Sequence, residues 1–104
     1  MANPQRGEIA AMIDGEERVL CLTLGALAEL EARLQAGDLV GLSERFAAGR
    51  VSARDLTAIL GAGLRGAGNA ISDDDLARMA IEGGLRGAAE IAARLLRATF
   101  GETP

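Results

Sequence analysis

The feature that most constrains the fold is an amphipathic segment at residues 23–34, TLGALAELEARL. Four leucines recur in it at three- and four-residue spacing, which places them on one stripe of an α-helix. They are Leu24, Leu27, Leu30 and Leu34. Thr23 can cap the first turn through its hydroxyl oxygen, and Glu29 precedes Arg33 by one turn, the favourable order for a local ion pair. The segment therefore predicts a helix whose apolar side other elements must cover.

The residues before this helix predict a β-hairpin. Two short apolar runs, EIAAMI and RVLCL, flank an Asp-Gly-Glu-Glu sequence at 14–17. Asp-Gly favours the positive φ angles of tight hairpin turns, and a four-residue loop would pair Ile9 with Leu22. Met12 and Val19 then lie on the other face of the hairpin. Either both faces are covered, or one face is a docking surface, because an isolated two-stranded hairpin is marginal in water.

Helix start and stop signals divide the rest of the chain. Ser52 and Ser72 each precede an Asp by three residues, a pattern that opens a helix. The expected helices cover about 38–49 with Leu39, Leu42 and Phe46 facing inward, 52–66, 72–83, and from 85 or 87 to 99. The predicted fold is α+β and mostly α, an N-terminal β-hairpin followed by four or five short helices. The 104 residues predict a single domain, with loose tails at 1–6 and 101–104.

Composition excludes several classes of function. The net charge is −4 and the 11 basic residues, all Arg, are scattered, which argues against a nucleic-acid partner. No apolar run is long enough to span a bilayer and the N-terminus does not resemble a signal peptide, so we expect no membrane partner and a cytoplasmic location. The chain has no His, Lys or Tyr, and Cys21 predicts a small buried side chain. We therefore expect no enzyme, cofactor or metal.

Two motif matches are better explained by structure than by chemistry. Residues 61–66, GAGLRG, satisfy the GxGxxG dinucleotide fingerprint, but they follow a helical pattern where the fingerprint needs a strand. Asp73, Asp74 and Asp75 suggest a metal site, yet the calcium-loop pattern fails because Arg78 occupies the place that requires Gly. Acidic residues in a first helical turn complement the helix dipole, which is the simpler interpretation.

The sequence resembles a known family along nearly its whole length. The matching features are the strand, DG turn and strand at 8–22, LTLGALAELEARL, the GDL break at 37–39, SARDL at 52–56 and the GLRGAG loop. They resemble the small phage-like tail proteins of gene transfer agents, which are similar to phage tail assembly chaperones. The resemblance implies a non-enzymatic chaperone that binds the tape-measure protein and keeps it soluble for tail-tube assembly. The tail-tube protein and a second copy of the chain are further partners that this interpretation allows.

The residues also predict where a partner would bind. A small acidic helical protein with a spare apolar groove could hold an amphipathic helix of the tape-measure protein. The candidates are the outer hairpin face, at Met12 and Val19, and the last helix, where Leu95 and Leu96 are predicted not to face one core together and Phe100 follows. The open alternative is that both sides pack internally or in a homo-oligomer. If the last helix binds the partner, Leu96→Asp should abolish partner binding without unfolding the chain.

Two other functions remain open at this stage. One is a structural tail or head component that is retained in the particle. The other is a small helical regulatory protein, suggested by the helix-break-helix spacing at 38–66. The sign and scatter of the charges weigh against the second.

Overall fold

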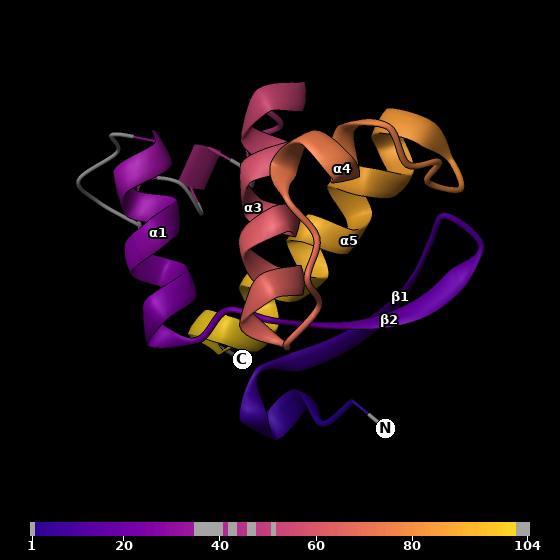
Figure 1. The fold of residues 1–104 in the computed structure, drawn as a ribbon. Coiled ribbons are helices and arrows are strands. Elements are labelled where there is room, and N and C mark those ends of the chain that lie inside the picture. The colour runs from indigo at the N-terminus through magenta and orange to yellow at the C-terminus, as the bar shows by residue number, and fades with distance from the viewer. Residues whose placement is uncertain (1, 35–40, 42–43, 46–47, 51, 102–104) are drawn as a thin grey trace.

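A computed structural model describes residues 2–34, 41, 44–45, 48–50 and 52–101, and confirms the predicted α+β fold (Figure 1). Its elements are η1 (Pro4–Arg6), β1 (Glu8–Ile13), β2 (Glu16–Cys21), α1 (Leu24–Leu34), α3 (Ala53–Gly66), α4 (Asp73–Ala77) and α5 (Gly84–Phe100). In Figure 1, α3 stands between α1 and α5, and the hairpin crosses beneath them. The predicted inward residues of the 38–49 helix, Leu39, Leu42 and Phe46, lie outside the described residues.

The hairpin closes through a two-residue turn, so the predicted four-residue loop is wrong. Asp14 and Gly15 have φ angles of 56° and 80°, and two positive values in succession match the right-handed twist of the flanking strands. Ile9 consequently lies opposite Leu20 and not Leu22. Because the register differs by an even number of residues, each side chain keeps its predicted face.

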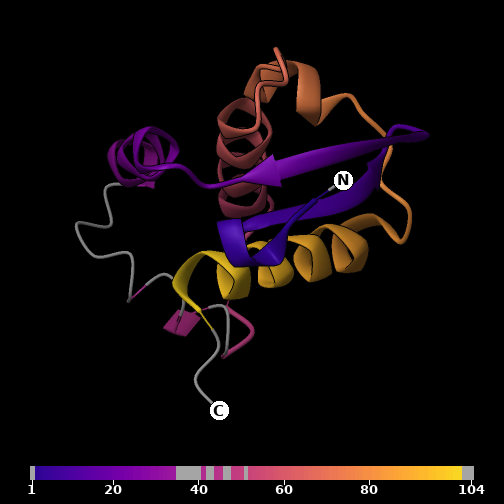
Figure 2. The same ribbon diagram turned by 90° about the horizontal axis from the view of Figure 1, so that it is seen from below.

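The core lies between the hairpin and two helices. α3 packs against β2 while α5 packs against β1, and Figure 2 shows both helices beside the hairpin with α1 beyond α3. The largest fully buried side chains are all aliphatic: Ile13, Leu20, Leu30, Ile59, Leu60, Leu64 and Leu95. Burial of this aliphatic surface is the main force that holds the hairpin and the helices together.

Helix α1 begins as predicted, and its predicted apolar stripe is buried in part: Leu30 is fully buried and Leu27 packs against the core. The amide of Ala26 donates to the Thr23 hydroxyl oxygen at 3.1 Å, which confirms the cap. Ala26 and Leu30 are buried against α3, whereas Leu24 is 86% exposed. Leu24 precedes Ala26 by two residues, roughly 200° around the helix, and therefore lies on the opposite side. The side chain of Leu34 lies outside the described part of the chain.

Helix α4 is shorter than predicted because the chain turns back to the hairpin. It ends at Ala77, where the sequence suggests a helix to about residue 83. The next residues bind the hairpin tip: the amide of Asp14 donates to the Ala80 carbonyl at 2.7 Å, and Ile13 forms a β-bridge with Ile81. Backbone groups used in this bridge are not available for a further helical turn.

The N-terminal residues, predicted as a loose tail, include the 3-10 turn η1, which contacts α5. The Asn3 carbonyl accepts from the amides of Arg6 and Glu8 at 2.9 and 3.1 Å. The Cys21 thiol, predicted to be buried, is half-buried and donates to the Arg6 carbonyl at 3.7 Å.

Among the described helices, none combines the length and the apolar character that crossing a membrane requires.

Candidate interaction surface

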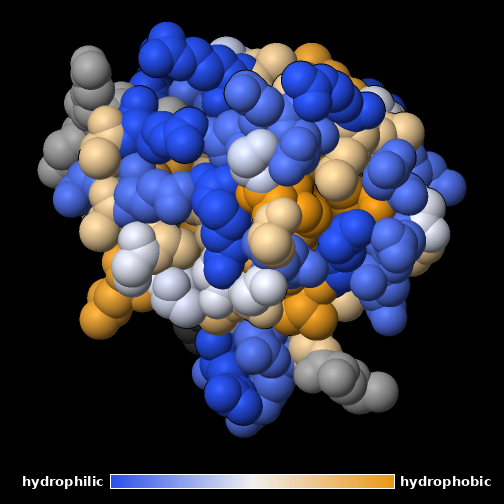
Figure 3. Space-filling model, viewed as in Figure 1, coloured by the Kyte–Doolittle hydropathy of each residue, from blue (hydrophilic) through white to orange (hydrophobic). Residues whose placement is uncertain are grey.

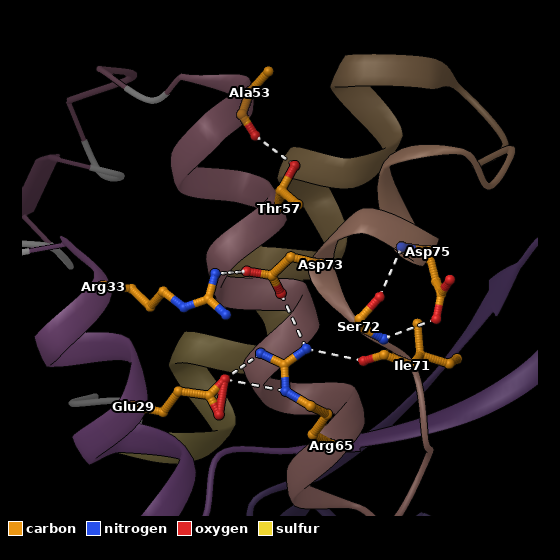
Figure 4. Close-up of polar contacts among 9 residues, drawn as sticks. All are labelled: Glu29, Arg33, Ala53, Thr57, Arg65, Ile71, Ser72, Asp73 and Asp75. Atoms are coloured by element: carbon orange, nitrogen blue, oxygen red, sulfur yellow. Dashed lines mark hydrogen bonds and ion pairs between the residues drawn. The ribbon is translucent and has the colours of Figure 1, made fainter.

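An open apolar hollow of about 290 Å³ lies between α3, α4 and α5. Six large aliphatic side chains line it: Leu56, Leu60, Leu76, Met79, Ile81 and Leu85. Thr57 also borders the hollow, but its hydroxyl donates to the Ala53 carbonyl at 2.8 Å and so satisfies its polar group within α3 (Figure 4). The hollow therefore offers mainly hydrocarbon to a ligand.

The sequence around α4 and the start of α5 builds this hollow. The Ser72 hydroxyl accepts from the amide of Asp75 at 3.0 Å, and the Asp75 carboxylate accepts from the amide of Ser72 at 3.2 Å. This capping box starts α4 beside α3, and its hydrogen bonds hold the pKa of Asp75 below the ordinary value. α5 then begins after Gly83, with φ 84°. Leu85, in the first turn of α5, is 62% exposed at the edge of the hollow.

On the face shown in Figure 3, hydrophobic surface forms small patches between hydrophilic side chains. One such patch lies near the middle of the view, over α3 and the segment that leads into α4. Exposed apolar patches on small proteins mark candidate contact sites when polar residues surround them.

The predicted partner-binding residues that are exposed in the structure lie far from one another. Met12 is 52% and Phe100 is 42% exposed, whereas Val19 is half-buried. Met12 neighbours Ile13, which bridges to the chain just before α5, while Phe100 ends that helix roughly 25 Å away by helical rise. These residues do not form one continuous surface.

The prediction that Leu95 and Leu96 do not face one core is wrong. Leu95 is 0% and Leu96 is 4% exposed. The reason is that α5 contacts both α3 and β1, so two adjacent positions on it are covered from different sides. Leu96→Asp would place a carboxylate in this core and unfold the chain, so it cannot serve as a test of binding.

Four charged residues form a cluster that joins α1, α3 and α4 (Figure 4). Arg65 is at its centre: Nε donates to Glu29 at 3.1 Å, and Nη1 donates to Asp73 at 3.0 Å and to the Ile71 carbonyl at 2.9 Å. Arg33 pairs with the other oxygen of Asp73. Glu29 and Arg33, predicted to pair with each other, thus make their ion pairs across to other helices.

The electrostatics of this charged cluster follow from its hydrogen bonds. The bond from Arg65 holds the pKa of Glu29 below its ordinary value, and the same bond raises the pKa of Arg65. Each of the four charges has a partner of opposite sign within the cluster. The arrangement fastens α1 and α4 to α3 and has the character of a structural contact.

The two motif matches have structural roles. GxGxxG at 61–66 lies inside α3, where a Cβ at Gly61 would overlap the Asp73 carboxylate and one at Gly66 the Cys21 carbonyl. The spacing of these glycines thus reflects close packing on α3. Asp73 and Asp75 are engaged in the charged cluster and the capping box. Within the described residues, no three potential ligands of this kind gather around a metal site.

Comparison with models of protein families identifies the family of the chain. The profile of a family described as "Phage tail tube protein, GTA-gp10" matches residues 6–102. The chain belongs to this family. Membership in the GTA-gp10 family makes it a phage-tail-related protein, which confirms the predicted resemblance to gene transfer agent tail proteins. No curated protein and no solved structure matches this GTA-gp10 member.

The hollow is the feature of this GTA-gp10 protein that the sequence did not predict. Its lining comes from α3, α4, α5 and the segment between the last two, so no local pattern contains it. Leu85 is a residue from which an exposed apolar site could have been suspected in the sequence. It is apolar and directly follows Gly83-Gly84, ahead of the buried positions of α5.

Proposed function

We propose that this GTA-gp10 family member is a tail assembly chaperone that binds the tape-measure protein and keeps it soluble for tail-tube assembly. The observation that best supports this proposal is the open apolar hollow with exposed Leu85 at its edge. Long amphipathic helices of a tape-measure protein would aggregate before the tube covers them, and a groove of this kind can shield an apolar helix face. The acidic net charge of −4 helps to keep such a complex in solution.

The experiment is co-expression of the chain with the tape-measure protein from the same gene cluster. We expect the tape-measure protein to move from the pellet to the soluble fraction and to co-purify with the chain. Expression of the tape-measure protein alone gives the baseline. If both proteins are folded at high concentration and neither capture nor improved solubility results, the chaperone proposal is wrong.

The family description favours a second candidate, a structural tail-tube component that remains in the particle. Its partners would be the tail-tube protein or further copies of the chain. Quantitative immunoblotting of purified particles separates the two functions. A stoichiometric amount in the particle supports the structural role, whereas presence in the cell extract and absence from particles supports the chaperone.

A further inference from the structure

The short helix α4 forms one side of the hollow, and few contacts hold it there. It spans five residues, all of them described, and Leu76 alone among them is buried. Leu76 and Ala77 line the hollow, together with Met79 just beyond the end of the helix. Short helices have little stability of their own, so the position of α4 depends on the contacts that its ends make.

The first residue of α4 is attached to both α3 and α1. One carboxylate oxygen of Asp73 accepts from Arg65 Nη1 of α3 at 3.0 Å, and the other pairs with Arg33 of α1 (Figure 4). The Asp73 side chain is 16% exposed and fits against α3 at Gly61, where an added Cβ would overlap the carboxylate. Partial burial reduces screening by water, so these contacts should stabilise the docking of α4 more than ion pairs in solvent do.

Helix α1 depends on the same arginine. It packs against α3, and Ala26 and Leu30 are the buried residues among those of α1 that the structure describes. Glu29 pairs with Arg65, the guanidinium group that also holds Asp73. Arg65 thus contacts one acidic residue from α1 and one from α4.

We propose that α1 and α4 dock on α3 as a coupled pair, with Arg65 and Asp73 as the connection, so that the docking of α1 controls the α4 side of the hollow. When Glu29 leaves Arg65, the guanidinium group loses one of the contacts that orient it toward Asp73, and α4 loosens. Linkage requires the reverse effect as well, so loss of the Asp73 contact loosens α1. This inference deepens the proposed function and rests on it, because it assigns a regulation to the proposed partner site.

Glu29→Gln tests the coupling from α1, because it removes the charge that pairs with Arg65. The readout is native-state hydrogen exchange of the amides of Leu76 and Met79, which are bonded within α4 and its last turn. We expect both amides to exchange at least about threefold faster, while those of the hairpin and α5 keep their rates. Glu31→Gln, at an exposed position on the same helix, is the matched control and should change none of these rates.

Asp73→Asn tests the coupling from α4. We expect the amides of α1 to exchange at least about threefold faster, whereas Asp74→Asn, at an exposed acid in the same turn, should leave them unchanged. In the double variant with Glu29→Gln, the acceleration at Leu76 should be smaller than the product of the two single effects, because either change already breaks the connection. Effects that simply multiply would overturn the proposal.

Two outcomes of Glu29→Gln also overturn it. Faster exchange confined to α1 would show that α4 docks independently. Equal acceleration in α1, α4, α5 and the hairpin would show that these elements open only together with the whole core.

These measurements use the free chain, so they separate this inference from the proposed function. Capture of the tape-measure protein without coupled exchange would refute the coupling and leave the chaperone function standing. Coupled exchange without capture would support the coupling and remove the proposed function.

Discussion

At the scale of single residues, glycines inside helices set how closely elements approach. Gly66 in the last turn of α3 lies against the Cys21 carbonyl, where an added Cβ would overlap backbone and reach Ala26 Cβ at 3.2 Å. Gly25 in α1 has more space, because its nearest neighbour would be the Thr23 hydroxyl oxygen at 3.9 Å. The same substitution therefore has opposite effects at the two positions.

We predict that Gly66→Ala lowers the free energy of unfolding by about 1–3 kcal/mol, because the backbone must shift to admit the methyl group. Gly25→Ala should raise it by up to about 1 kcal/mol, since alanine is the better helix former. Urea unfolding monitored by circular dichroism measures both. Equal stability of the two variants would mean that α3 and β2 do not approach as described.

The charged cluster makes a prediction about pH. Since Arg65 lowers the pKa of Glu29 in the folded chain, folding releases a proton from Glu29 in the acidic range. The stabilisation is fully present above the unfolded pKa of about 4.3 and is lost as the pH falls through the lower folded value. Urea midpoints should therefore fall more steeply between about pH 5 and 3 in the original chain than in Glu29→Gln.

Glu31→Gln is the control for this titration, because Glu31 is exposed on the same helix. Its midpoints should follow those of the original chain. Parallel pH profiles for the original chain and Glu29→Gln would show that the Glu29–Arg65 contact does not stabilise the fold.

At the scale of elements, side chains from the helical layer occupy the outer edges of the hairpin. The side-chain amide of Asn69 donates to the Val19 carbonyl at 2.9 Å and to the Leu64 carbonyl at 3.1 Å, which connects β2 to α3. On the other strand, Arg94 donates to the Ala10 carbonyl at 2.9 Å. Unpaired strand edges invite pairing with other chains, so these contacts also limit strand addition to the hairpin.

We predict that Asn69→Ala lowers the free energy of unfolding by about 1–2 kcal/mol, because the Val19 carbonyl loses its side-chain donor, whereas the Leu64 carbonyl keeps the backbone amide of residue 69 at 2.9 Å. Asn3→Ala should lower it by less, because the Asn3 side chain accepts only from the Gln5 amide, at 3.0 Å in the exposed N-terminal turn, and connects no other element. Chemical denaturation measures both. A loss at Asn69 no larger than that at Asn3 would indicate that this connection between β2 and α3 contributes little.

The starts of helices that depend on nearby residues could be predicted from the sequence. Thr23, Ser52 and Ser72 open helices because their hydroxyl oxygens accept bonds from amides three residues on, and nothing distant is needed. The extent of α4 was not predictable, because Ala80 binds Asp14 across 66 residues of chain. The hollow and the burial of Leu96 were missed for the same reason, since several elements that are distant in the sequence create them.

At the scale of the whole molecule, the two ends of the chain complete one core. A Cβ at Gly63 would lie 2.6 Å from Leu95 Cδ2 and 3.3 Å from Leu20 Cβ, so α3, α5 and β2 meet at this point. α5 covers β1, and η1 at the N-terminus contacts α5. The hollow is part of the same arrangement, because its lining includes residues from both α3 and α5.

The contact of α5 with β1 has a consequence for how the chain is made. While a ribosome has synthesised only the hairpin, α1 and α3, the inner side of β1 has no cover. β1 therefore lacks this cover until α5 has been synthesised, so the core closes only after residues 84–100 are available. A message cut short before Gly84 would therefore give a product that cellular proteases remove, and not a smaller working protein.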